Sequence, residues 1–339
     1  MTDAPAPMDA AVDAPSIDAP SIDASSIDAP ATDAPVDVML APDVSTRPVP
    51  SLSTPRSHLG AAVARDGKVY AIGGVTSSTR ASNAVEMWDP VAGATSWVSR
   101  ASLPIGIRSA GVAAGGDGRI YVYGGENGSG PSDRAFAYDP ATNTWRELAR
   151  MARRRYAVAS AGALDGRVYA LNGNAGAGGT VRDAQAYDPM TSAWATLGST
   201  PLHTEGSAAA GGADGRVYLF GGYDNATHYR DVSVFDPTTG AWTTAPRLPE
   251  GRAWHGAALA LDGTFHVAGG DELRSRPTDA HRVYDPVARA WRNAAPLPEP
   301  RDSFAMVTLL DGRVLAIGGV TLGDTRLATV RAWAAGAWR

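Results

Sequence analysis

Cysteine is absent from the 339-residue chain, and lysine occurs once, at Lys68. Without cysteine the chain has neither a disulfide framework nor a thiolate metal site. No run of about 18 apolar residues occurs, so we expect no transmembrane segment. Residues 1–30 have neither a basic start nor an apolar stretch, so the sequence as given shows no signal peptide.

The net charge of −5 conceals an acidic N-terminal tract. Residues 1–46 contain nine Asp and no Glu, Lys or Arg, and so carry −9, which leaves +4 for residues 47–339. A weakly positive body behind an acidic arm lacks the charge pattern of a nucleic-acid-binding protein. We therefore expect no nucleic-acid partner.

The acidic tract repeats a five-residue unit, DAPSI-DAPSI-DASSI-DAPAT-DAP, over residues 13–35. A period of five matches neither helix nor strand, and proline blocks both, so we predict a disordered linker over residues 1–50. It resembles the Asp-Ala-Pro linkers of bacterial envelope lipoproteins. That resemblance implies an extracytoplasmic protein, secreted or tethered to the envelope, with an export signal upstream of Met1. The sequence leaves open whether Met1 is the true start.

Two sequence columns recur six times after residue 50. The first is an Asp-Gly turn, an apolar run and a glycine pair: DGKVYAIGG (66–74), DGRIYVYGG (117–125), DGRVYALNG (165–173), DGRVYLFGG (214–222), DGTFHVAGG (262–270) and DGRVLAIGG (311–319). The second is an aromatic residue, Asp-Pro in the first five copies, and a closing tryptophan: Trp97, Trp145, Trp194, Trp242, Trp291 and Trp338. Their spacing of 47 to 49 residues is typical of a repeat architecture.

Each copy is predicted to form four antiparallel strands, A to D. Asp-Gly favours the tight turn of a hairpin, which in the first copy joins strand A (58–64) to strand B (68–72). Asp-Pro favours a type I turn between strand C and strand D, which holds the closing Trp. A four-stranded sheet cannot bury both faces alone, so we expect radial packing of the copies, with the aromatic residues between them.

The Gly-Gly, Tyr-Asp and Trp columns resemble the kelch motif and cover residues 53–339. The resemblance implies an all-β, six-bladed β-propeller of four-stranded antiparallel kelch blades over residues 51–339. We place the blades at 53–100, 101–149, 150–197, 198–246, 247–294 and 295–339. The sixth copy ends just after its closing Trp, so we expect residues 44–50 to lie against the outer edge of the last blade and help close the ring.

A charged column stands where the chain begins each strand A, on the face that carries the variable B–C loops. It lies 16 or 17 residues before the first residue of the glycine pair (Asn172 in the third copy) and comprises Arg56, Arg108, Arg155, Glu205, Arg252 and Arg301. Arginine pairs bidentately with carboxylate or phosphate, and variable loops on a rigid scaffold often bind ligands. In some kelch domains, arginines at this mouth contact acidic peptides. We predict a ligand-binding ring, with a fold role, satisfaction of loop carbonyls, as the alternative.

We therefore predict a monomeric, non-catalytic binding scaffold without cofactor or metal. Its partner would be a protein segment or a glycan, and the arginines favour an anionic one. The neighbouring residues that could add specificity are His58, Tyr156, His203, Trp254 and His255. The alternative is an enzyme resembling the sialic-acid mutarotase kelch propellers, with Glu205 beside Arg155 or Arg252 as the acid–base pair. A copper oxidase resembling galactose oxidase is excluded, because its Tyr–Cys cross-link needs cysteine. The sequence does not name the ligand.

Overall fold

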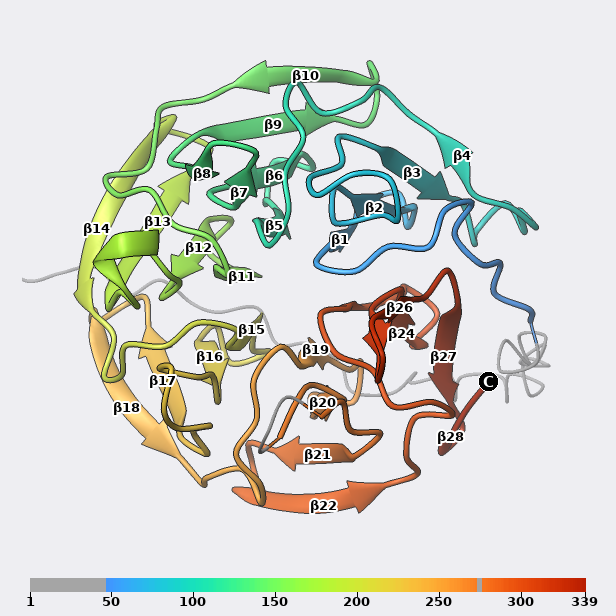
Figure 1. Ribbon diagram of the computed structural model, residues 1–339. Coiled ribbons are helices and arrows are strands. Elements are labelled where there is room, and N and C mark those ends of the chain that lie inside the picture. The colour runs from blue at the N-terminus through green and yellow to red at the C-terminus, as the bar shows by residue number, and fades with distance from the viewer. Residues whose placement is uncertain (1–46, 273–275) are drawn as a thin grey trace, which may run out of the picture. The chain divides into compact units, whose positions relative to one another are not determined.

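The computed structural model describes residues 47–272 and 276–339. These residues form six four-stranded antiparallel sheets in a ring around a central axis (Figure 1), which confirms the predicted fold class. The linker predicted over residues 1–50 lies outside the described residues except for its last four positions.

The strands of each blade follow the chain from the axis outward (Figure 1). Strand A is β1 (Gly60–Val63), β5 (Gly111–Ala114), β11 (Ala159–Gly162), β15 (Ala208–Gly211), β19 (Gly256–Leu259) and β23 (Ala305–Thr308). Strand B is β2 (Val69–Ile72), β6 (Ile120–Tyr123), β12 (Val168–Leu171), β16 (Val217–Phe220), β20 (Phe265–Ala268) and β24 (Val314–Ile317). Strand C is β3 (Val85–Trp88), β9 (Ala135–Asp139), β13 (Asp183–Asp188), β17 (Val232–Asp236), β21 (His281–Asp285) and β27 (Val330–Ala334). Strand D is β4 (Val98–Ser99), β10 (Thr144–Glu147), β14 (Ala193–Ser199), β18 (Ala241–Ala245), β22 (Ala290–Ala294) and β28 (Ala337–Trp338).

Short elements occupy three of the B–C connections. Blade 2 carries the hairpin β7 (Glu126–Asn127) with β8 (Gly130–Pro131), and blade 6 carries β25 (Val320–Thr321) with β26 (Thr325–Arg326). Blade 3 carries the 3₁₀ turn η2 (Gly176–Gly178). The strands fall within the six predicted blade ranges, except that β14 runs two residues past residue 197.

The core lies between neighbouring blades. Every strand B is buried along its whole length, as expected from a sequence that is apolar or aromatic in all blades except for His266 in β20. Tyr138 of blade 2 meets Tyr70 of blade 1 edge to face, with ring centroids 5.4 Å apart. The closing Trp145 packs on Tyr138 and donates its indole N–H to the carbonyl of Ala101, in the connection that leads from blade 1 to blade 2 (2.8 Å). The aromatic residues therefore join one blade to the next, as predicted.

Small residues line the channel because the innermost strands crowd together. A Cβ added to Gly162 of β11 would lie 2.3 Å from the carbonyl oxygen of Ala114 in β5. Alanine and glycine predominate in five of the six A strands, whereas β23 contributes Met306, Val307 and Thr308, so the channel is lined mainly by main chain and small apolar groups. The chemistry of the axis is therefore concentrated at its ends, where the loops begin.

Residues from both ends of the described chain meet between blades 6 and 1. The N–H of Leu52 donates to the carbonyl of Ala328 (2.8 Å), and the indole of Trp97 donates to the carbonyl of Pro50 (2.8 Å). Leu103 and Trp145 make the equivalent bonds one blade further on. Residues 47–52 thus take the place of a D–A connection, while the C-terminal β28 supplies the outermost strand. Residues 44–46, also predicted to lie at this edge, fall outside the described residues.

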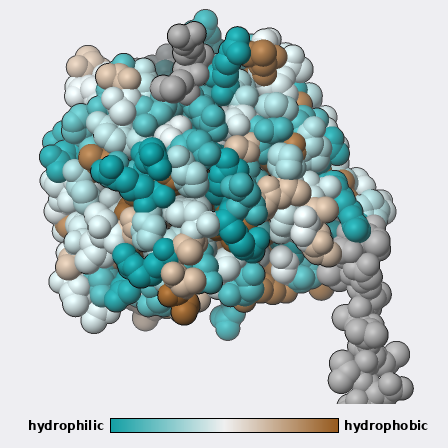
Figure 2. Space-filling model, turned by 90° about the horizontal axis from the view of Figure 1, so that it is seen from below, coloured by the Kyte–Doolittle hydropathy of each residue, from teal (hydrophilic) through white to brown (hydrophobic). Residues whose placement is uncertain are grey.

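The side of the outer wall that Figure 2 shows is mainly hydrophilic. In the side view of Figure 2, hydrophobic residues appear singly or in small groups among polar ones. Within the described ranges, no helix is long and apolar enough to cross a bilayer.

Blade 5 departs from the other blades by burying two histidines against blade 6. His266 replaces the tyrosine of the first four copies, and its Nδ1 lies 2.9 Å from Nε2 of His281. The indole of Trp338 donates to Nδ1 of His281 (3.2 Å). Burial lowers the pKa of His266 to about 4 and that of His281 to about 3. Both rings are therefore neutral in the fold at pH 7.

We predict that the double substitution His266→Tyr with His281→Val reduces the acid sensitivity of the fold. Tyrosine is the residue of the first four copies, and Val85, Val232 and Val330 align with His281. Below about pH 6.5 both histidines are protonated in the unfolded chain, whereas the buried rings of the folded protein stay neutral. The free energy of unfolding therefore decreases as pH falls from about 6.5 towards 4. Urea unfolding near pH 7 and pH 5 should show a decrease about 3–4 kcal/mol smaller in the variant, because each of the two histidines contributes about 2 kcal/mol. Equal decreases in both proteins would contradict this account. His58 and His255 titrate in both proteins and cancel in the comparison.

Candidate functional site: the mouth of the channel

Four arginines of the predicted ring are fully buried. Arg56, Arg155, Arg252 and Arg301 each have 0% exposed surface. The Nη1 of each donates to two main-chain carbonyls of its own blade, one at the end of strand B and one just before or at the start of strand C. For Arg155 these are the carbonyls of Asn172 (3.1 Å) and Asp183 (2.7 Å). These guanidinium groups hold the B–C connection closed from within and do not face the channel.

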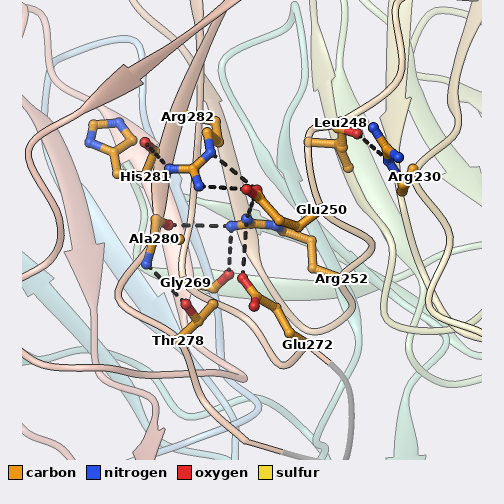
Figure 3. A network of polar contacts seen from close by, with 10 residues as sticks. All are labelled: Arg230, Leu248, Glu250, Arg252, Gly269, Glu272, Thr278, Ala280, His281 and Arg282. Atoms are coloured by element: carbon orange, nitrogen blue, oxygen red, sulfur yellow. Dashed lines mark hydrogen bonds and ion pairs between the residues drawn. The ribbon is translucent and has the colours of Figure 1, made fainter.

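Blade 5 shows the arrangement in detail (Figure 3). Nη1 of Arg252 donates to the carbonyls of Gly269 (3.2 Å) and Ala280 (3.3 Å), and Nη2 pairs with Glu250 (3.1 Å) and Glu272 (3.4 Å). A buried guanidinium needs such partners because its desolvation is costly. Burial lowers the pKa of Arg155 and Arg301 to about 10, so both stay charged at pH 7. This is the fold role that the sequence left open as the alternative.

Arg108 and Glu205 stand one residue beyond the buried column. In five blades the second residue of the glycine pair donates its main-chain N–H to a main-chain carbonyl at the start of the next blade. The acceptor is one of the buried arginines in three of these blades, and Ile107 (2.8 Å) or Thr204 (2.9 Å) in the other two. Ile107 and Thr204 therefore align with the four arginines. Arg108 and Glu205 align instead with Ser57, Tyr156, Ala253 and Asp302, each in an isolated bridge to the start of its B–C loop. The structure thus does not bring the six predicted residues together in one ring.

The next residue in every blade adopts the left-handed conformation. Its φ lies between 50° and 63° in His58, Ser109, Ala157, Gly206, Trp254 and Ser303. We call these six residues the neck. Main-chain hydrogen bonds link much of it: Ser109 donates to His58, His58 to Ser303, Ser303 to Trp254, and Trp254 to Gly206 (2.6–2.9 Å). The neck surrounds a cavity of about 110 Å³, which Leu59, Ser207, His255 and Phe304 also line.

The bridged residues form an inner rim around the neck. We define it as Ser57, Arg108, Tyr156, Glu205, Ala253 and Asp302 with their partners Val75, Glu126, Asn174, Tyr223, Asp271 and Val320. The positive charge of Arg108 is paired, because its Nη2 lies 2.7 Å from Oε2 of Glu126. Asp324 and Arg326, in and beside the β25–β26 hairpin, form a second pair (3.3 Å) near His58, whose pKa they influence. Carboxylates outnumber arginines at this mouth.

Glu205 is the most enclosed carboxylate of the rim. It is 6% exposed, and Nδ2 of Asn174 donates to its Oε2 (3.1 Å). Burial raises its pKa, while hydrogen bonds from Asn174 and Tyr156 act in the opposite direction. Burial and the nearby Glu205 carboxylate raise the pKa of Tyr156. Arg155 and Arg252, the two partners that the sequence suggested for Glu205, point into their own blades.

A second group of acids lies at blades 5 and 6. Nε2 of His228 is 2.6 Å from Oδ1 of Asp271, and the His228 ring packs against Tyr223 (4.7 Å between centroids). Burial, opposed by a hydrogen bond from Ser303 and reinforced by the neighbouring carboxylates of Asp271 and Asp324, raises the pKa of Asp302 to about 6. Asp271 and Asp302 were not among the predicted site residues. Their positions in the repeat could have identified them, because Asp271 directly follows the glycine pair and Asp302 directly follows the buried Arg301.

The neighbouring residues proposed from the sequence divide in the same way. His58 and Trp254 belong to the neck, with ring centroids 5.7 Å apart, and Tyr156 belongs to the rim. His255 lies beneath them and lines the cavity. His203 lies further out, where its Nδ1 meets the hydroxyl of Thr180 (3.0 Å). Among residues 47–272 and 276–339, no group of three or more His, Asp or Glu side chains is placed to hold a metal ion.

Comparison with known proteins gives a consistent picture of the repeats. A family model described as the Kelch motif matches residues 56–104 and 107–152, and one described as the KLHDC2/KLHL20/DRC7 Kelch-repeats domain matches residues 154–319. Kelch repeat and BTB domain-containing protein 12 of Danio rerio is 34% identical over 136 residues, which cover 34% of this chain and 21% of that protein. N-acetylneuraminate epimerase of Pasteurella multocida is 35% identical over 83 residues, 23% of this chain and 22% of that protein.

The chain thus spans about a fifth of the length of these curated relatives. Among solved structures, that of YjhT superposes with a TM-score of 0.71 at 19% identity. The match covers 86% of this chain and 99% of YjhT. At that identity the likeness concerns the fold alone.

We predict that Arg252→Met and Arg108→Met have very different effects on stability. Removal of the buried guanidinium leaves the Gly269 carbonyl and the Glu272 carboxylate without this donor and takes one of several donors from Ala280 and Glu250, which should lower the free energy of unfolding by about 2–4 kcal/mol. The half-exposed Arg108 makes one ion pair at the surface, so its loss should cost less than about 1 kcal/mol. Urea unfolding of the two variants measures the difference. Similar losses in both would contradict the assignment of Arg252 to the fold and Arg108 to the rim.

Proposed function

Because the chain belongs to the kelch-repeat family, whose propeller suits a binding scaffold, we propose that it is a non-catalytic binding protein that holds its partner at the mouth. The partner is a segment of another protein or a glycan, and it contacts the inner rim and the neck. Of the six side chains predicted from the sequence, Arg108 and Glu205 remain as candidates for direct contact. The four buried arginines do not contact the partner; they bind main-chain carbonyls and so stabilise the B–C connections next to the site.

The observation that carries this proposal is the presence of large side chains at the neck. A left-handed conformation is unfavourable for bulky residues, and the other four blades have serine, alanine or glycine there. Trp254 and His58 nevertheless occupy the neck in blades 5 and 1. The indole of Trp254 lies against Gly206, where an added Cβ would come within 2.9 Å of the ring. Two aromatic rings held at the channel mouth, with polar groups around them, have the composition of a recognition site.

We predict that Trp254→Ala weakens binding without unfolding the propeller. Alanine is tolerated at this position, because Ala157 occupies it in blade 3 with φ 51°. Binding of the full chain to an arrayed panel of peptides and glycans should fall by about tenfold or more for the ligands that it captures. Trp145→Phe, which alters a closing Trp between blades, is the matched control. Unchanged binding by the Trp254 variant would remove the neck from the account.

A second candidate function is epimerisation or ring opening of a sugar acid. It is supported by the local similarity to N-acetylneuraminate epimerases and by the enclosed Glu205, whose raised pKa suits a general acid or base. Two features weigh against it. The rim is rich in carboxylates, which repel an acidic sugar, and the guanidinium of Arg108 is already engaged by Glu126.

We expect no catalysis of sugar-acid mutarotation. The measurement is NMR of freshly dissolved N-acetylneuraminate with the wild-type chain and with Glu205→Gln as the control. Both should show the uncatalysed rate. A faster rate with the wild-type chain that Glu205→Gln abolishes would establish the enzymatic alternative instead.

The extracytoplasmic location and the monomeric state remain proposals. They rest on the composition of residues 1–46 and on the mainly hydrophilic side of the outer wall seen in Figure 2. If the chain is displayed outside the cytoplasm, the mouth is exposed to extracellular partners.

A further inference from the structure

The rim and neck form a compartment at blade 5 whose chemistry indicates the charge of the ligand. This argument rests on the proposed function, because it describes the ligand of the same mouth. In the series of neck hydrogen bonds, Trp254 donates to Gly206 (2.6 Å) and accepts from Ser303 (2.8 Å). The rim residues that precede these neighbours are Glu205 and Asp302. Two carboxylate residues therefore flank Trp254, one on each side.

The rim position of blade 5 itself places no charged or bulky side chain between those carboxylates. It is occupied by Ala253, which has only a methyl group, and its bridge partner is Asp271. The compartment therefore has Trp254 at its base and acidic residues of blades 4, 5 and 6 around it. A cation in such a place would gain from the indole face and from the carboxylates together. An anion would be repelled.

A separate observation beneath the compartment also indicates a ligand that donates hydrogen bonds. His255 is 5% exposed and lines the neck cavity. The main chain of Phe220 lies close enough to one ring nitrogen to raise the pKa of His255 slightly, and the other nitrogen has no hydrogen-bond partner among the described residues. Burial, and then the charge of Arg252, lower its pKa to about 3, so the ring is neutral and carries one acceptor nitrogen. Buried polar groups normally have partners, and an ammonium or guanidinium group would supply one.

We infer that the mouth recognises a cationic group, the lysine or arginine side chain of a partner protein, which enters over Trp254 between Glu205 and Asp302. This differs from the anionic ligand that the arginine column suggested. Asp302 gains most from the cation, because it lies close to two other carboxylates, Asp271 and Asp324. Arg108 and Arg326 do not cancel the attraction, since each is paired with an acid of its own.

The test is selection from a phage-displayed library of random peptides on the full chain. We expect the captured peptides to share a lysine or arginine, and synthetic copies with that residue replaced by norleucine or glutamate to lose binding. Asp302→Asn should weaken the cationic peptides by about tenfold or more. Asn keeps the main-chain bridge to Val320, so the fold is retained. Glu147→Gln removes one carboxylate from the outer strand of blade 2 and should leave binding unchanged.

The outcomes separate the two proposals. Captured peptides that are anionic or neutral, or equal binding by Asp302→Asn and Glu147→Gln, would overturn the cationic assignment. Binding that survives in Trp254→Ala would place the ligand elsewhere and overturn the proposed mouth site as well. Capture of no peptide at all would contradict both a peptide partner and its cationic side chain.

Discussion

The architecture of the mouth depends on one backbone constraint, a left-handed residue where the chain begins each innermost strand. All six blades meet it at the same position, and hydrogen bonds between these residues draw much of the neck together around the axis. The constraint fixes the directions of the preceding side chains. The residue two positions earlier points back into the blade, and the residue one position earlier is bridged to the B–C loop at the rim.

This geometry gives neighbouring charged residues opposite roles. In four blades the inward position holds an arginine that is buried and occupied by main-chain carbonyls, so its charge stabilises the loop and is unavailable to a ligand. One residue later, the rim carries Arg108, Glu205 and Asp302, whose environments are set by the loops of adjacent blades. The mouth is therefore acidic, although arginines are frequent in its sequence.

The sequence was sufficient for the fold, because turn chemistry, strand pattern and aromatic spacing recur in register six times. It also named six residues that lie at the rim, the neck or the neck cavity: Arg108, Glu205, Tyr156, His58, Trp254 and His255. It was not sufficient for the roles within the charged column. Arg155 stands 17 residues before Asn172, whereas Arg108 and Glu205 stand 16 residues before Gly124 and Gly221, and that single-residue difference separates buried from rim positions. The rim acids contributed by B–C loops, such as Asp271, could not be paired with Asp302 without knowledge of which blades adjoin.

The most direct test of this account is the hydrogen exchange of arginine side-chain Nε–H groups, measured by NMR on the full chain. The account predicts that Arg56, Arg155, Arg252 and Arg301 exchange slowly and keep their signals unchanged when a ligand occupies the mouth, while Arg108 exchanges rapidly. If any of the four exchanges as rapidly as Arg108, or shifts on ligand binding as Arg108 does, the separation of an internal arginine column from an acidic rim is wrong.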